Sequence, residues 1–168
     1  MHAALPSWTT VFLDFDADSH ERGLVFWEAV TGYRRSPVRG NDGEFLTLQP
    51  SGGDGHLRVQ RLGSGPTRTH VDLHVADVDT AVPAATELGA SVVLRGNRHV
   101  ALSSPGGYTF CLVPAGESVR AEPAIWPDGQ RSIVDQLCLD IPPRLYDGEA
   151  AFWRDLTGWE FRPPSDTP

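Results

Sequence analysis

Apolar and polar positions alternate along the stretch WTTVFLDFD at 8–16, which is rich in β-branched and aromatic residues and therefore predicts a strand. Apolar residues at helical spacing follow. Asp18 and Glu21 form a capping-box pattern where this helix begins. Gly32 stands where a glycine commonly ends a helix. The pattern therefore predicts a strand followed by a helix.

Two further strands are predicted at 44–49 and 56–62, joined by the turn-forming residues 51–55. A short strand near 35–40 is also compatible with the pattern. Together these elements form a β-α-β-β unit, or β-α-β-β-β with the short strand, over 8–62.

The same order of elements starts again at Thr69. A strand at 69–77 precedes a helix at 78–88, and three strands follow, at 91–94, 98–103 and 108–113. Pro83 lies within this helix, where its ring and missing N–H disturb a turn. Two alternatives are open: the helix starts near Thr80, or it is kinked. The second unit spans 69–113.

A third start follows a segment without periodicity. Residues 116–131 are predicted to be a linker, 132–141 a strand and 149–156 a helix, and RPPSDTP carries no folding signal. The predicted organisation is a domain at 1–115, the linker at 116–131, and an incomplete second domain at 132–168.

An internal repeat supports this organisation. FWEAVTGY at 26–33 recurs as FWRDLTGW at 152–159, and the same ungapped alignment pairs Asp14 with Asp140. The Phe and Trp of both copies are predicted to pack on a sheet. A lone strand and helix is not stable alone, so it packs on the first domain, pairs with a second copy as a homodimer, or begins a larger parent protein. We expect the last.

Composition narrows the class of partner. The chain has 168 residues and a formal net charge of −8, which argues against nucleic acid and against an anionic membrane surface. No apolar stretch approaches the roughly 20 residues of a membrane helix. Two cysteines make no disulfide framework. We therefore expect a cytoplasmic protein.

Three motifs together resemble a known family: FWEAVTGY after a strand, HVDLHVADVDTAVPAATELGA, and SPGGYTFCLV as a closing hairpin. They are similar to the vicinal oxygen chelate superfamily, in its glyoxalase/bleomycin-resistance/dioxygenase branch. The resemblance implies an α+β fold in which two βαβββ modules, 8–62 and 69–113, pair into a cup-shaped, mostly antiparallel sheet with helices outside. Members include lyases, epimerases, dioxygenases and drug-sequestering proteins, so the fold leaves function open.

Alternation along the strand at 69–77 predicts that His70, Asp72 and His74 face the cup. Residues i and i+4 of a strand lie about 13 Å apart, whereas two ligands of one ion lie about 3–4 Å apart. His70 and His74 therefore cannot bind the same metal ion.

The resemblance also implies where a metal would bind. In metal-using members the ligands come from the first and last strand of each module, and these positions are here Phe12, Gln60, His70 and Cys111. Phe12 cannot ligate a metal and Gln60 is a weak ligand. We expect no bound metal. The alternative is zinc, nickel or iron held by His70, Cys111 and Gln60.

The predicted function is binding of a small, partly apolar organic molecule, of the sequestering kind, by Phe12, Arg58, Gln60, His70, Asp72 and Cys111. Arg58 pairs with an anionic ligand or with Asp14, which otherwise has a structural role. The alternative is a glyoxalase-like lyase, isomerase or dioxygenase, metal-dependent or not, with His70 or Asp72 as the catalytic base. A scaffold whose cup is filled by its own side chains is a third alternative.

Overall fold

The computed structural model describes residues 5–160. Its elements follow the order expected for two βαβββ modules, so the predicted α+β class is confirmed. The first module has β1 (Trp8–Phe15), α1 (His20–Thr31), β2 (Arg34–Arg35), β3 (Phe45–Gln49) and β4 (Leu57–Arg61). The second has β5 (Arg68–Val75), α2 (Val78–Glu87), β6 (Ser91–Arg95), β7 (Val100–Ser103) and β8 (Thr109–Pro114).

The chain divides into two compact units. The N-terminal unit contains Trp8–Asp72 and Gly116–Cys138, and the C-terminal unit contains Leu73–Ala115 together with the described parts of 1–7 and 139–168. The boundary falls within β5, so that His70 and Asp72 belong to the N-terminal unit and Cys111 to the C-terminal unit.

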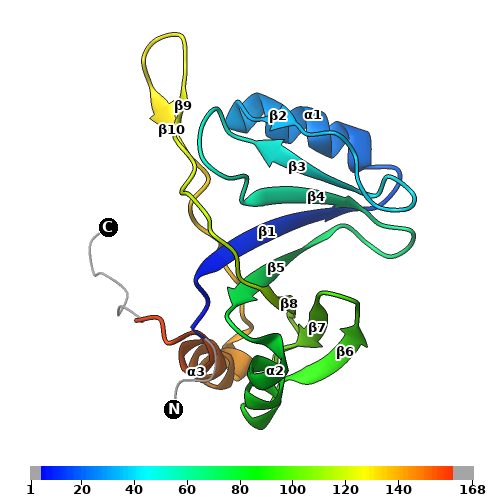
Figure 1. Cartoon of the computed structure of the whole chain (residues 1–168), viewed down its shortest axis with the longest axis vertical. Helices are drawn as coiled ribbons and strands as arrows, with labels where there is room; N and C mark the ends of the chain where they lie inside the picture. The colour runs from blue at the N-terminus through cyan, green and yellow to red at the C-terminus, as the bar shows by residue number, and fades with distance from the viewer. Residues whose placement is uncertain (1–4, 161–168) are drawn as a thin grey trace. The chain divides into compact units, whose positions relative to one another are not determined.

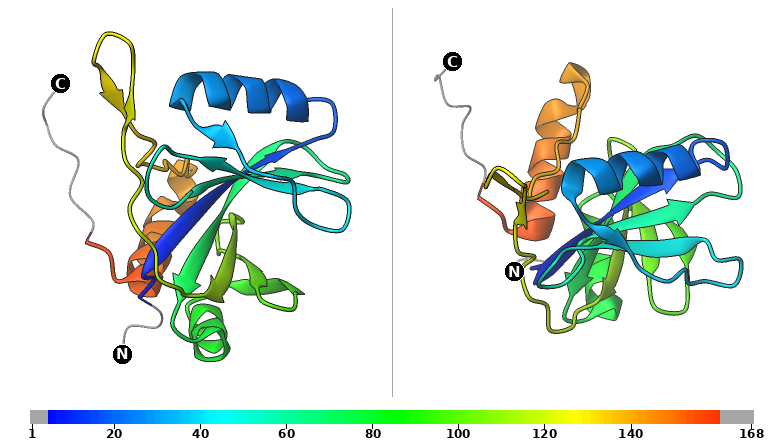
Figure 2. Two further views of the ribbon diagram at one scale, coloured as in Figure 1. Left: turned by 45° about the horizontal axis from the view of Figure 1, so that its top comes forward. Right: turned by 90° about the horizontal axis from the view of Figure 1, so that it is seen from above.

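A mixed sheet forms the N-terminal unit. Its strands β2, β3, β4 and β1 are neighbours in that order; β1 and β4 run parallel, whereas β2, β3 and β4 pair antiparallel. Helix α1 lies along one face of these strands (Figures 1 and 2). Leu24 of α1 and the apolar side chains of the sheet form one core, which comprises Leu13, Phe15, Leu24, Tyr33, Leu46, Leu48, Leu57 and Val59.

One predicted feature at the helix starts is wrong, and one alternative is decided. The capping box of Asp18 and Glu21 is wrong, because the carboxylate of Asp16 accepts the N–H groups of Asp18 and Ser19 instead. Helix α2 begins at Val78, so Pro83 lies inside the helix rather than in its first turn. Gly32 ends α1 with a φ of 70°, as predicted.

The segment 116–138 packs on the N-terminal unit. Its short strands β9 (Ala124–Ile125) and β10 (Arg131–Ser132) pair antiparallel and form the finger at the top of Figure 1. Val119 exchanges two hydrogen bonds with Asp54, of 2.9 and 2.7 Å, and the carbonyl oxygen of Val134 lies 2.5 Å from Nε2 of His56. The residues predicted as a linker therefore include a hairpin attached to the sheet.

The predicted strand at 132–141 is wrong, since only Ser132 of these residues is in a strand. The short helix η1 (Pro143–Leu145) and α3 (Tyr146–Thr157) follow. A strand requires a partner for its main-chain groups, and residues 133–141 pair with none of the described strands. The segment RPPSDTP at 162–168 lies outside the described part of the chain. The proposed division into a domain, a linker and an incomplete domain stays a prediction.

Helix α3 packs on the C-terminal unit. Phe152 and Trp153 contact Phe110 of β8 with ring centroids 5.9 and 5.2 Å away. Of their copies in α1, Trp27 packs against the core of the N-terminal unit, whereas Phe26 is 57% exposed and Phe152 only 3% exposed. The prediction that both copies of the phrase pack on a sheet is therefore wrong for Phe26.

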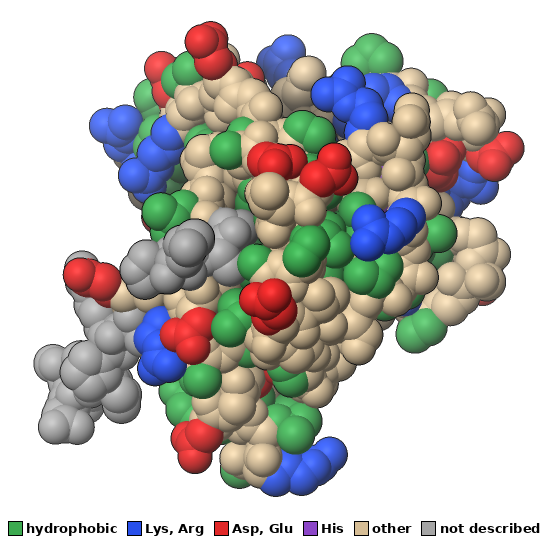
Figure 3. Space-filling model, turned by 60° about the horizontal axis from the view of Figure 1, so that its bottom comes forward, with side chains coloured by type: hydrophobic (Ala, Val, Ile, Leu, Met, Phe, Trp, Pro, Cys, Tyr) green, Lys and Arg blue, Asp and Glu red, His purple; other side chains and the backbone are tan. Residues whose placement is uncertain are grey.

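Acidic and basic side chains are interspersed on the face shown in Figure 3. Among the described residues, none of the helices has both the length and the apolar character needed to cross a membrane.

Candidate functional site

The sheet of the N-terminal unit has one apolar and one polar face. Leu13 and Val59 belong to the core under α1, and side chains alternate along a strand. The residues on either side of Leu13 in β1 and of Val59 in β4 therefore lie on the opposite face. There the strand register places Phe12 beside Arg58 and Asp14 beside Gln60. We call this the polar face; it comprises Phe12, Asp14, Thr47, Arg58, Gln60, His70 and Asp72.

His70 is held in place on this face by two neighbours. Its Nδ1 lies 2.7 Å from Oδ2 of Asp14, and its ring lies parallel to that of Phe12, with centroids 4.5 Å apart and an interplanar angle of 10°. His70 is 8% exposed and Asp14 is fully buried. The predicted orientation of His70, on the face away from the helix, is confirmed.

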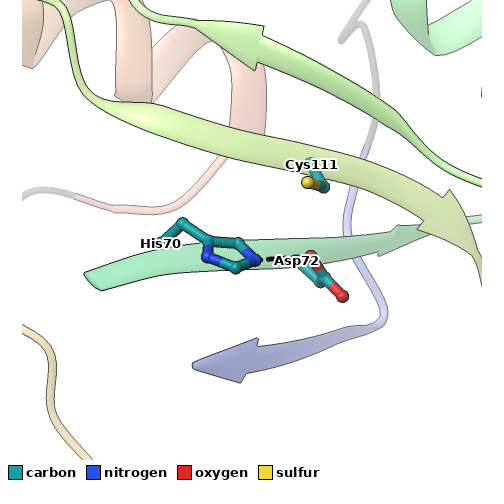
Figure 4. A group of neighbouring side chains, drawn as sticks. All are labelled: His70, Asp72 and Cys111. Atoms are coloured by element: carbon teal, nitrogen blue, oxygen red, sulfur yellow. Dashed lines mark ion pairs between the residues drawn. The ribbon is translucent and has the colours of Figure 1, made fainter. Parts of the chain in front are cut away.

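Asp72 lies on the other side of the imidazole. Its Oδ1 is 3.7 Å from Nε2 of His70, and the dashed line in Figure 4 marks this contact. This separation is beyond hydrogen-bonding distance. The two carboxylates thus flank the ring, Asp14 in direct contact with one nitrogen and Asp72 near the other.

The two carboxylate oxygens of Asp14 have different surroundings. Its Oδ2 also accepts a hydrogen bond of 3.3 Å from Nε of Arg68, a side chain that is 52% exposed. Its Oδ1 is buried and has no hydrogen-bond partner within residues 5–160. The structural role predicted for Asp14 is thus a bond to Arg68, and the same oxygen also bonds His70, the candidate base.

Arg58 brings a positive charge to the polar face. Its guanidinium carbon lies 5.7 Å from the centroid of the Phe12 ring, a cation–π geometry. Burial lowers the pKa of Arg58, and the nearby charge of Arg39 adds to this, whereas the Asp72 carboxylate opposes it. Arginine nonetheless remains protonated in proteins. The charge on Arg58 is therefore maintained at a desolvation cost.

The hydrogen-bonding capacity of Arg58 is not exhausted. Its buried Nε has no partner among the residues that the structure describes. Two pairings were predicted for Arg58, with an anionic ligand or with Asp14. Within the described residues Arg58 forms no ion pair with Asp14, whose carboxylate contacts His70 and Arg68 instead. An oxygen of a bound anion would satisfy the Nε–H group.

The donors of the N-terminal unit do not by themselves fit a catalytic zinc site. His70 Nε2 and Asp72 Oδ1, 3.7 Å apart, match the spacing of two ligands of one ion. Phe12, at one of the four ligand positions that the resemblance implies, stacks on His70 and cannot ligate a metal. Two donors fall short of the three protein ligands of ordinary catalytic zinc.

Cys111, also drawn in Figure 4, lies in β8 of the C-terminal unit and is buried. Ligand sets that join Cys111 to residues of the N-terminal unit stay predictions. Gln60 lies in β4, next in register to Asp14. The structure therefore brings five of the six predicted ligand-binding residues to one unit, namely Phe12, Arg58, Gln60, His70 and Asp72.

Sequence reasoning missed the bond between Asp14 and His70. Alternation along 8–16 already places Asp14 on the same face as Phe12. The local pattern does not show that β1 and β5 are neighbours in the sheet, because this pairing joins segments far apart in the chain.

A family model described as a glyoxalase-like domain matches residues 10–113. A search among curated proteins found no match. Among solved structures, a xylose isomerase-like TIM barrel/4-hydroxyphenylpyruvate dioxygenase fusion protein is 15% identical over 94% of this chain and 28% of its own, with a TM-score of 0.64.

Two further structures match less of the chain. The 2,2',3-trihydroxybiphenyl 1,2-dioxygenase from Sphingomonas wittichii strain RW1 is 15% identical over 70% of this chain and 42% of its own, with a TM-score of 0.49. The Mn(II)-bound glyoxalase from Novosphingobium aromaticivorans is 18% identical over 68% of this chain and 40% of its own, also at 0.49. The chain thus spans less than half the length of these three structures.

Proposed function

Because the chain belongs to the glyoxalase-like domain family, we propose that its polar face binds a small, partly apolar organic molecule that carries an anionic oxygen. The observation that carries this proposal is the buried Nε–H of Arg58, which lacks a hydrogen-bond partner among the described residues and lies beside the ring of Phe12. A buried donor without a partner costs free energy that a bound oxygen would recover.

The chemistry of the neighbouring side chains supports a ligand that is both flat and polar. Phe12 and His70 form a parallel aromatic pair next to the guanidinium, and His70 and Asp72 add polar atoms. Binding sites of this kind combine apolar surface with a few placed polar groups that orient the ligand. Sequestration of such a molecule needs no chemical step.

Three commercial probes test the proposal. Benzoate has the ring and the anion, 3-hydroxybenzoate adds a hydroxyl group, and phenol lacks the anion. Isothermal titration calorimetry with the full chain is expected to show saturable binding of both carboxylates, and weaker binding of phenol. Absence of saturable binding by both carboxylates at millimolar concentration contradicts the proposal.

Arg58→Gln is the decisive variant, and Arg34→Gln, an exposed arginine of β2, is its matched control. A hydrogen bond to a charged group contributes about 1.5–3 kcal/mol, so Arg58→Gln is expected to weaken benzoate binding at least about tenfold. Arg34→Gln is expected to bind as the wild type does. Equal affinities for benzoate in the wild type and Arg58→Gln would reject the assigned role of Arg58.

A second candidate is a lyase or isomerase in which His70 removes a proton. The contact between Asp14 and His70 favours it, since a buried carboxylate that orients an imidazole is a common arrangement for a general base. Incubation with 2-hydroxyacetophenone in deuterium oxide tests it: catalysed exchange of the proton next to the carbonyl, abolished in His70→Ala, supports this candidate. No exchange above the uncatalysed rate rejects it for this class of substrate.

A further inference from the structure

We propose that Asp14 is a positioning residue that holds neutral His70 as the Nδ1–H tautomer, so that the ligand meets the Nε2 lone pair and must offer a hydrogen-bond donor there. This inference rests on the proposed function for its ligand part only. The assignment of the tautomer concerns the free protein. The ligand part narrows the proposed ligand class to anions that also carry a hydroxyl or enol group.

The distance and the burial of the pair carry the first step. Oδ2 of Asp14 is 2.7 Å from Nδ1 of His70. An ionised carboxylate only accepts hydrogen bonds, so the hydrogen between the two atoms belongs to Nδ1. Nε of Arg68 donates to the same oxygen at 3.3 Å, so this carboxylate oxygen acts as an acceptor toward both neighbours.

Packing of the ring carries the second step. The imidazole lies parallel to the Phe12 ring with centroids 4.5 Å apart, and His70 is 8% exposed. A half-turn of the ring would move Nδ1 away from Asp14 and break the hydrogen bond at a buried carboxylate. The stacked, bonded orientation therefore determines which nitrogen is directed at Asp72.

The relation of His70 to Asp72 carries the third step. In the Nδ1–H tautomer, Nε2 is an acceptor, and Oδ1 of Asp72 at 3.7 Å is a second acceptor. Two acceptors at this separation do not bond each other, but one donor placed between them can bond both. A hydroxyl or enol group of a ligand is such a donor, while Arg58 meets its anionic oxygen.

The tautomer is measurable directly. In ¹⁵N-labelled full-length protein at a pH that keeps His70 neutral, long-range ¹H–¹⁵N correlation spectra distinguish a protonated from an unprotonated ring nitrogen. The wild type is expected to show protonated Nδ1 and unprotonated Nε2 for His70. A protonated Nε2 in the neutral wild type overturns the inference, and this test needs no variant.

Asp14→Asn and Asp72→Asn form a matched pair. Each removes one carboxylate beside the imidazole with little change in volume. Replacement of an orienting aspartate by asparagine can install the wrong histidine tautomer, so Asp14→Asn is expected to move the hydrogen to Nε2, whereas Asp72→Asn keeps it on Nδ1. A His70 spectrum that Asp14→Asn leaves unchanged, in a protein with wild-type circular dichroism, overturns the positioning role.

Calorimetry separates this inference from the proposed function. In the wild type, 3-hydroxybenzoate is expected to bind at least tenfold more tightly than benzoate, and in Asp14→Asn this advantage disappears. If benzoate binds but the hydroxyl group adds nothing in the wild type, the ligand part of the inference is overturned. If neither carboxylate binds, the proposed function fails while the tautomer assignment is judged by its own spectrum.

Discussion

The carboxylate of Glu149 in α3 accepts a hydrogen bond of 2.6 Å from the main-chain N–H of Gly106, in the turn between β7 and β8. The same carboxylate accepts the hydroxyl of Ser104 and, at 2.9 Å, the indole N–H of Trp153. Glu149 is only 3% exposed. A Cβ atom on residue 106 would lie 2.6 Å from Oε2, so glycine permits this approach.

Replacing Glu149 is therefore expected to loosen α3 from the C-terminal unit. Glu149→Leu leaves the N–H of Gly106 and the indole N–H of Trp153 without their acceptor, and such orphaned buried groups cost about 1–3 kcal/mol each. Urea unfolding followed by circular dichroism is expected to show a loss of at least about 2 kcal/mol. Asp147→Leu, an exposed position of the same helix, is the control. Similar losses in both variants would contradict the anchoring role.

The doubled phrase offers an internal comparison of equivalent phenylalanines. Phe152→Ala is expected to cost about 3–5 kcal/mol, because it removes a buried ring packed on Phe110. Phe26→Ala is expected to cost less than about 1 kcal/mol, because Phe26 is 57% exposed. The free energy of unfolding in urea measures both. Equal losses of unfolding free energy in the two variants would contradict the expectation that burial decides what each phenylalanine contributes to stability.

Low pH is expected to reduce the free energy of unfolding partly through protonation of Asp16. Hydrogen bonds, first from Thr67 and then from Ser19, lower the pKa of Asp16 from 3.8 to about 2. Between these values the unfolded chain binds more protons, so this contribution to stability is complete above pH 3.8 and is lost as the pH falls toward 2. Asp16→Asn is expected to flatten the pH dependence of the unfolding free energy in this window.

Thr67→Val provides the second measurement for Asp16. It removes the largest cause of the lowered pKa and keeps the carboxylate. The slope of unfolding free energy against pH is expected to fall between those of the wild type and Asp16→Asn. A slope in Thr67→Val equal to that of the wild type would show that the hydroxyl group does not control this carboxylate.

Metal content is expected to be well below one ion per chain in protein purified without an affinity tag. The reason is that two of the four ligand positions implied by the family resemblance hold Phe12, which cannot ligate a metal, and Gln60, which is a weak ligand. Inductively coupled plasma mass spectrometry measures zinc, nickel and iron. Stoichiometric metal that His70→Ala removes, and that Cys138→Ser at an exposed position leaves in place, would contradict this expectation.

Periodicity along the chain determined the elements of the two modules and the face on which each side chain lies. Alternation in WTTVFLDFD and in the strand containing His70 is a local property of the main chain, so Phe12, His70 and Asp72 could be assigned to the polar face from sequence. The glycine that ends α1 was predicted for the same reason, since left-handed backbone favours glycine.

Tertiary structure decided which of these side chains meet. The bond of Asp14 to His70, the exposure of Phe26 against the burial of Phe152, and the missing strand at 132–141 all depend on neighbours distant in sequence. Strand partners and buried contacts come from the packing of non-adjacent segments, and no local pattern encodes them. The sequence by itself thus determined the modules and the polar face, and the packing of β5 beside β1 alone decided that a buried aspartate orients the histidine.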